Sequence, residues 1–112
     1  MARNPDTVRA PDLAFIQSAR LTPEASGSNW NPVIPDLVAE VVSSADRRSE
    51  VEEKVQMWLD AGVRLVWVAY PARRKVGVHR PGQSPLVLLV SDMLDGLEVI
   101  PGFAYLVGAL FT

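Results

Sequence analysis

Hydrophobic and polar positions alternate along the chain in a way that predicts several short strands around one amphipathic helix. Between positions 46 and 61 the apolar residues recur at helical spacing, and Val51, Val55, Trp58 and Leu59 would form one stripe. Gly62 follows this segment, and glycine is the usual residue just beyond the end of a helix. The pattern therefore predicts a helix over residues 46–61.

Five apolar runs have the length and the flanking turn residues of β-strands. The run at 63–70 is almost entirely apolar, which is typical of a central strand that is covered on both faces. A short edge strand is expected at 97–100 and a helical turn within 103–111. The five runs occupy residues 10–16, 36–43, 63–70, 75–80 and 85–90.

A long polar connection separates the first two predicted strands. Residues 17–35 are rich in Ser, Thr, Asn, Gly and Pro, and a loop of this length in a small domain is often functional. We expect a short helical turn at 22–25 within it. We also expect Trp30 to fold back onto the body of the domain.

The composition is that of one globular domain. The chain has 112 residues, of which 48% are hydrophobic and 21% charged, which predicts a single domain over residues 1–112. It contains no cysteine, and this excludes disulfides and thiolate metal sites. The first residues lack the apolar run of a signal peptide, and no apolar run is long enough to span a bilayer. We therefore expect a cytoplasmic protein with no membrane segment.

The charge distribution permits a nucleic-acid enzyme. A net charge of −2 is unlike that of a protein that coats nucleic acid, but clustered arginines and a bound cation can supply a positive field locally. Arg47 and Arg48 near the helix start are candidates for phosphate contacts, as are Arg73, Arg74 and Lys75 at a turn between strands. The alternative is that both runs are simply solvated surface.

Three carboxylates in or beside apolar strands suggest a metal site. Asp36 and Glu40 lie on one face of the predicted strand 36–43, but they are about 13 Å apart and cannot both bind one ion. If the strand that Asp12 opens pairs with this one, Asp12 and Glu40 could be neighbours at about 4.5–5.5 Å between Cβ atoms. Carboxylate oxygens suit Mg²⁺ or Mn²⁺ better than zinc. The alternative is that these acids are strand-end caps or solvated edges.

Two further polar residues lie at positions where chemistry is possible. Lys54 borders the apolar stripe of the helix, at about 60° from Val51 around the axis, and could orient a water or stabilise charge on a phosphate. The alternative is that Lys54 only flanks the stripe and extends its amine to water. His79 has no second histidine and no cysteine nearby, which favours a structural role over that of a general base.

The segment 35–43, PDLVAEVVS, followed by Glu53-Lys54 and by 61–68, AGVRLVWV, resembles the Uma family of restriction endonucleases. That family belongs to the restriction-endonuclease-like PD-(D/E)XK nuclease superfamily. The resemblance covers most of the chain from about residue 8 and includes the closing segment from Ile100 to Phe111. Together with the strand and helix pattern, it implies an α+β fold. The expected architecture is a mixed sheet of about five or six strands with one main helix and a reduced N-terminal part.

The resemblance also implies roles for individual residues. Asp12 matches the motif aspartate, Glu40 matches the acid of the E-x-K element, and both would bind Mg²⁺ or Mn²⁺. The lysine expected two residues after that acid is replaced by Val42, and Lys54 on the following helix fits the substitute position. Asp36 matches a further acid of the motif and would be auxiliary. The implied activity is metal-dependent cleavage of DNA.

The chain departs from the family pattern in ways that leave two functions open. Family members are usually longer at the N-terminus, where a helix supplies another acid, and only eleven residues precede Asp12 here. One hypothesis is a Mg²⁺-dependent DNA endonuclease that uses Asp12, Glu40 and Lys54. The other is a truncated, catalytically inactive member that serves as a dimerisation or interaction module. Because a missing element would expose a sheet edge, we expect a homodimer.

Overall fold

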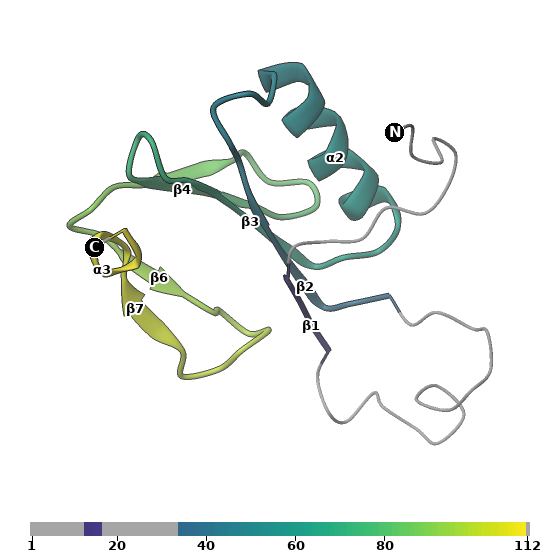
Figure 1. Ribbon diagram of the computed structural model, residues 1–112. Coiled ribbons are helices and arrows are strands. Elements are labelled where there is room, and N and C mark those ends of the chain that lie inside the picture. The colour runs from purple at the N-terminus through teal and green to yellow at the C-terminus, as the bar shows by residue number, and fades with distance from the viewer. Residues whose placement is uncertain (1–12, 17–33, 112) are drawn as a thin grey trace.

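The computed structural model of the protein describes residues 13–16 and 34–111 (Figure 1). The predictions that concern Asp12, the turn at 22–25 and Trp30 lie outside these residues. In chain order the elements are β1 (Leu13–Phe15), β2 (Leu37–Val41), α2 (Arg48–Asp60), β3 (Leu65–Tyr70), β4 (Lys75–His79), β5 (Leu86–Leu88), β6 (Met93–Asp95), β7 (Ala104–Leu106) and α3 (Val107–Leu110).

The main sheet has five strands in the order β1-β2-β3-β4-β5, and β6 pairs with β7 in a separate two-stranded sheet. Strands β2 and β3 are parallel, with Glu40 opposite Val68, and helix α2 connects them. The other pairs in the main sheet are antiparallel. The predicted mixed sheet with one main helix is confirmed, and the apolar run at 63–70 supplies its central strand.

Each face of the main sheet carries its own core. Helix α2 covers one face, where Val55 and Trp58 pack on residues of β2 and β3 such as Val38 and Val66. The β6–β7 sheet and α3 lie over the other face (Figure 1), where Trp67 packs against Phe103 with ring centroids 5.6 Å apart. Because side chains alternate along a strand, Asp36, Val38 and Glu40 of the β2 segment all face α2.

Helix α2 begins and ends at residues whose backbone suits those positions. The N-cap is Arg47, whose backbone N–H donates to the Glu50 carboxylate at 3.1 Å, so Glu50 satisfies an amide that the helix leaves free. At the other end Gly62 has φ +109°, a conformation that side chains rarely adopt. The predicted helix is confirmed, with its start two residues later than expected.

The prediction of an edge strand at 97–100 is wrong. The backbone N–H groups of Val99 and Ile100 both donate to the carbonyl of Gly96, at 3.1 and 3.0 Å, and Leu97 has φ +54°. These residues form a turn between β6 and β7. Their hydrophobic side chains still serve the core, because Val99 is buried among the residues beneath the second sheet. The strand periodicity there reflects burial and not strand pairing.

The remaining elements follow the predictions in outline. The strand expected at 85–90 is shorter, since β5 ends at Leu88 and the Leu89 N–H donates to the Asp92 carboxylate at 2.8 Å. The helical turn expected within 103–111 is α3, but Ala104–Leu106 before it forms β7. No helix in the described part of the chain is long and apolar enough to cross a bilayer.

Candidate functional site

Glu40 is a charged side chain at the boundary between helix α2 and the sheet, and only 4% of it is exposed. Lys54 Nζ donates to its Oε1 at 3.2 Å, and the Trp58 indole N–H donates to its Oε2 at 2.8 Å. A buried carboxylate is costly unless hydrogen bonds and an opposite charge compensate for it. Both oxygens of Glu40 are compensated by helix α2.

The two donors to Glu40, Lys54 and Trp58, lie on one face of the helix. Lys54 and Trp58 are four residues apart, so they lie one above the other on the side of α2 that meets β2. Trp58 is buried in the core, whereas 37% of the Lys54 side chain is exposed. The carboxylate therefore has one partner that faces the core and one that faces solvent.

Glu40 and Lys54 both line a hollow of about 380 Å³ between α2 and β2. Three more acids, Asp46, Glu50 and Glu53, are also at its wall. The Glu40–Lys54 pair is thus open to small solutes from the Lys54 side. A carboxylate and an ammonium group at the wall of such a hollow can bind a cation and stabilise an anionic reaction partner.

The residues of this site fit a magnesium ligand set only in part. Among residues 13–16 and 34–111, no group of three or more Asp, Glu, His or Cys side chains is arranged to hold a metal ion. Glu40 supplies one hard oxygen donor at the hollow, and Mg²⁺ often takes only one or two carboxylates and keeps several waters. Asp12, the second predicted ligand, lies outside the described residues.

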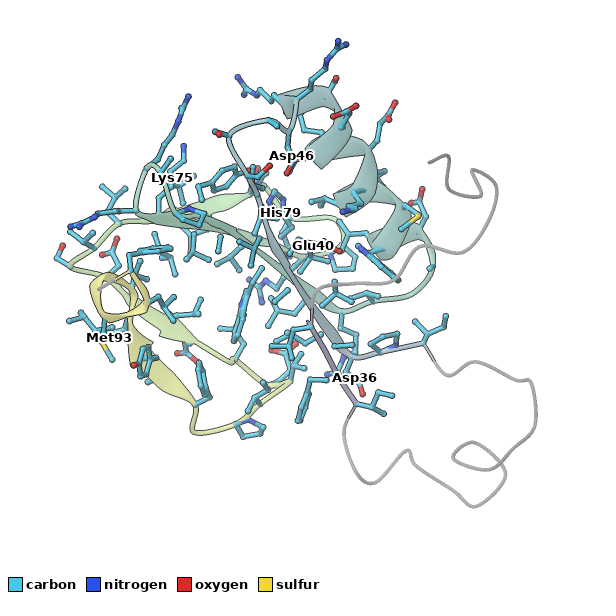
Figure 2. All side chains as sticks on the ribbon, viewed as in Figure 1. Asp36, Glu40, Asp46, Lys75, His79 and Met93 are labelled. Carbon is cyan, nitrogen blue, oxygen red and sulfur yellow. The ribbon has the colours of Figure 1, made fainter. Side chains whose placement is uncertain are left out.

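Asp36 occupies the opposite end of the β2 segment from Glu40 (Figure 2). Its side chain is fully buried, and Arg64 Nη1 lies 3.5 Å from its Oδ1. The backbone ties the same two residues together, because the Arg64 N–H donates to the Asp36 carbonyl at 3.2 Å. These contacts suit a structural acid that joins the start of β2 to the turn before β3.

A groove of about 740 Å³ lies beside the Glu40 hollow, between α2 and strands β3 to β5. Of the predicted DNA-binding residues, Arg48, Arg73 and Lys75 line this groove. Arg47 and Arg74 are exposed and are not among the lining residues. The groove and the hollow share four residues, Val42 and Asp46 before α2 and Val51 and Val55 on it.

His79 also lines the groove, from strand β4, where it is paired with Val66 of β3. Burial lowers the pKa of His79 below its usual value of 6.5, although the nearby Glu52 carboxylate opposes this by favouring the protonated ring. At neutral pH the imidazole is therefore uncharged.

Comparison with known proteins identifies the family. The family model described as "Putative restriction endonuclease" matches residues 2–108. The chain belongs to the Uma2 family. A crystal structure from Anabaena variabilis ATCC 29413, titled as a "putative nuclease belonging to DUF820", has a similar fold, with a TM-score of 0.65 and 21% sequence identity. The similarity covers 71% of the Uma2 chain and 45% of that chain. No curated protein matches.

Sequence reasoning identified the Glu40–Lys54 neighbourhood of the Uma2 chain but missed three participants. Trp58 was assigned to the core, yet it also holds Glu40; its position four residues after Lys54 was the available signal. Arg64 was not recognised as the partner of Asp36, because sequence spacing alone does not show that the two ends of the β2–α2–β3 unit meet. The location of His79 in a groove also had no sequence signal.

Proposed function

We propose that this protein is a Mg²⁺-dependent DNA endonuclease whose active centre is built around Glu40. The observation that carries the proposal is the buried Glu40 carboxylate, held by Lys54 and Trp58 at the wall of a solvent-accessible hollow. Membership in a family described as restriction endonucleases supports phosphodiester hydrolysis as the chemistry. Mn²⁺ is expected to replace Mg²⁺, because both prefer oxygen ligands.

Asp12 is the proposed second metal ligand. Strands β1 and β2 are antiparallel, with Leu13 opposite Ala39 and Phe15 opposite Leu37. We propose that this register continues by one residue, so that Asp12 pairs with Glu40 on the face covered by α2. Directly opposed residues have Cβ atoms about 4.5–5.5 Å apart, close enough for two carboxylates to share one ion.

Each proposed residue has a separate task. Asp12 and Glu40 would hold the ion, which polarises the phosphodiester and activates a water when it is bound. Lys54 would turn its ammonium group toward the charge that develops on phosphorus. Trp58 fixes the orientation of Glu40, and Asp36 is an auxiliary acid that secures the start of β2. Of the five predicted phosphate contacts, we propose the three that line the groove beside the hollow: Arg48, Arg73 and Lys75.

The proposal is tested by calorimetric titration with Mn²⁺ and by a plasmid-nicking assay. The wild type should bind Mn²⁺ and nick plasmid, and Glu40→Gln should lose the binding. Lys54→Met should retain Mn²⁺ but nick at least about 100-fold more slowly, as expected when a stabilising charge is removed. Asp60→Asn, which removes an exposed carboxylate at the far end of α2, is the matched control and should behave like wild type. No Mn²⁺ binding at millimolar concentration would overturn the proposal.

A second candidate, an interaction module that forms homodimers, is favoured by the edge of the main sheet. Four large side chains at and after β5 are between 44% and 57% exposed: Leu86, Val87, Leu89 and Val90. Residues 81–91 contain no charged side chain, although natural edge strands are commonly protected by charges. Light scattering at micromolar concentration should then give the mass of a dimer, and the mass of a monomer would contradict it.

A further inference from the structure

The groove between α2 and strands β3 to β5 is distinct from the Glu40 hollow and has its own chemistry. It is lined from the helix by residues such as Arg48 and Glu52, and from the sheet by Tyr70, Lys75 and His79. Neither Glu40 nor Lys54 is among its lining residues. A ligand could therefore occupy the groove without displacing the pair that we assign to catalysis.

The groove is locally basic in a chain whose net charge is −2. Four cations and two acids line it, and both acids already have partners. Asp46 Oδ2 accepts from the Ser43 N–H at 2.9 Å, and Glu52 Oε2 lies 3.2 Å from Arg48 Nε. In the described part of the chain, no acid lies within salt-bridge distance of Arg73, Lys75 or Arg80. These three cations are available to an anion.

Two rings provide flat surface beside these cations. Tyr70 and His79 both line the groove, and Lys75 Nζ is positioned over the Tyr70 ring at 5.1 Å from its centroid. Gly77 lies between Lys75 and His79 on β4. A Cβ at this position would lie 3.1 Å from His79 Nε2 and 3.8 Å from Tyr70 Cε2. The absence of a side chain at Gly77 therefore leaves room for both rings at the floor of the groove.

The size of the groove restricts what can enter it. A volume of 740 Å³ lies in the range of pockets that hold small organic molecules, about 300–1,000 Å³. One or two nucleotides of a strand fit such a space, whereas a double helix could only rest across its rim. Positive charge beside aromatic rings is the combination with which proteins bind single strands, because phosphates contact the cations and bases stack on the rings.

We propose that this groove binds a single nucleic-acid strand, with one phosphate at Arg73 and Lys75, another at Arg80 beyond the other end of β4, and an unpaired base on the His79–Tyr70 floor. The groove meets the Glu40 hollow at Val42, Asp46 and the first half of α2, so the strand would continue toward the catalytic carboxylate. The choice of nucleic acid as ligand rests on the proposed function. The binding itself requires neither metal nor cleavage.

The first experiment measures fluorescence anisotropy of a labelled oligothymidylate and of a duplex of equal length, both in EDTA. The single strand should bind more tightly than the duplex. Arg73→Gln and Lys75→Gln should each weaken single-strand binding about tenfold, as expected for loss of a charged hydrogen bond. Each should also reduce the salt slope of the affinity by about 0.7, since one phosphate contact is lost.

Arg74→Asn is the matched control. It removes the same charge from the same turn but outside the groove, and asparagine tolerates the positive φ of 53° at this position. A nonspecific basic surface would make all three substitutions equally harmful, whereas the groove model predicts less than a twofold change for Arg74→Asn. Equal losses at positions 73, 74 and 75, or tighter binding of the duplex, would overturn the proposal.

A second pair of variants tests the base contact. His79→Ala should weaken single-strand binding about tenfold, and His79→Phe should retain it, because stacking needs a flat ring and not a charge. Circular dichroism melting of each variant checks that the fold is intact. Equal binding by the two variants would refute base stacking at this residue.

Failure of this proposal and failure of the nuclease proposal give different results. The wild type should bind the oligonucleotide in EDTA, where it can hold no Mn²⁺. If the duplex is preferred but Glu40→Gln abolishes nicking, the groove proposal is wrong and the endonuclease proposal is supported. If the single strand binds in the groove but no metal binds, the groove proposal is supported and the endonuclease proposal is wrong.

Discussion

At the scale of single residues, the decisive feature is a carboxylate buried under a helix with a donor for each oxygen. Spacing and resemblance together predicted that Glu40 and Lys54 belong to one site, and their atoms lie 3.2 Å apart. The contribution of Trp58 could not be predicted, because an indole on an apolar stripe is most simply a core residue. Only the three-dimensional register of α2 on β2 shows that its N–H reaches Glu40.

The hydrogen bond from Trp58 to Glu40 should be measurable as stability. Trp58→Phe keeps an aromatic ring but removes a donor to a charged group, which should lower the free energy of unfolding by about 1.5–3 kcal/mol beyond the cost of lost volume. Trp67→Phe is the matched control. Trp67 is equally buried, and within the described part of the chain its N–H has no hydrogen-bond partner. Urea unfolding of both variants gives the difference, and equal losses would contradict the prediction.

His79 should make stability depend on pH. Its pKa in the folded protein lies below the value of 6.5 that it has when unfolded, so the unfolded chain binds the proton more readily. The free energy of unfolding should therefore fall as the pH drops from 6.5 through the lowered pKa, with no contribution above 6.5. Urea unfolding at a series of pH values should show a smaller decrease for His79→Gln. Parallel curves for the two proteins would rule out this assignment.

At the scale of elements, the sequence was most informative where a local signal and tertiary packing agree. The helix over Arg48–Asp60 and the central strand Leu65–Tyr70 combine periodicity, length and clear end signals. The segment 97–100 misled because hydrophobic residues in a tight turn can also be buried. Its positive φ at Leu97 and its hydrogen bonds to Gly96 depend on the neighbouring hairpin, which short-range patterns do not reveal.

At the end of helix α2, glycine should be the more stable residue at position 62 and alanine the more stable residue at position 61. Gly62→Ala should lower the free energy of unfolding by about 1–3 kcal/mol, because φ at this position is +109°. Ala61 has an ordinary helical φ of −77°, so there the reverse change, Ala61→Gly, is the unfavourable one, by about 0.5–1 kcal/mol. Thermal or urea unfolding measures both. A stabilising Gly62→Ala would show that the helix ends differently in solution.

At the scale of the whole molecule, the two edges of the main sheet differ in what they offer to other molecules. Strand β1 lies at the edge beside the Glu40 strand, while β5 presents exposed leucine and valine side chains at the opposite edge. Partner binding at β5 would leave the Glu40 hollow open, because no β5 residue lines it. The proposed nuclease activity and the proposed self-association are thus compatible in one molecule.

Self-association through β5 predicts that charge on this edge produces a monomer. Leu86→Lys combined with Leu89→Lys places two cations on side chains that are 57% and 55% exposed, so the monomer fold should tolerate them. Light scattering should then give half the mass of the wild type. Met93→Lys, at a half-exposed side chain in the second sheet, serves as the control and should remain dimeric. An unchanged mass for the double variant would place any dimer interface elsewhere.

The β2–α2–β3 unit has a consequence for how the candidate site forms. Glu40 contacts residues only 14 and 18 positions further along the chain, and no segment from outside this unit interrupts it. Closing a loop of 14 or 18 residues costs less entropy than closing one across the whole chain, so these contacts can form early in folding. The β6–β7 hairpin, whose own strands are three residues each, can open locally without parting Glu40 from Lys54. Amide exchange should then be slowest in β2 and β3, with the site persisting in partly open states of the molecule.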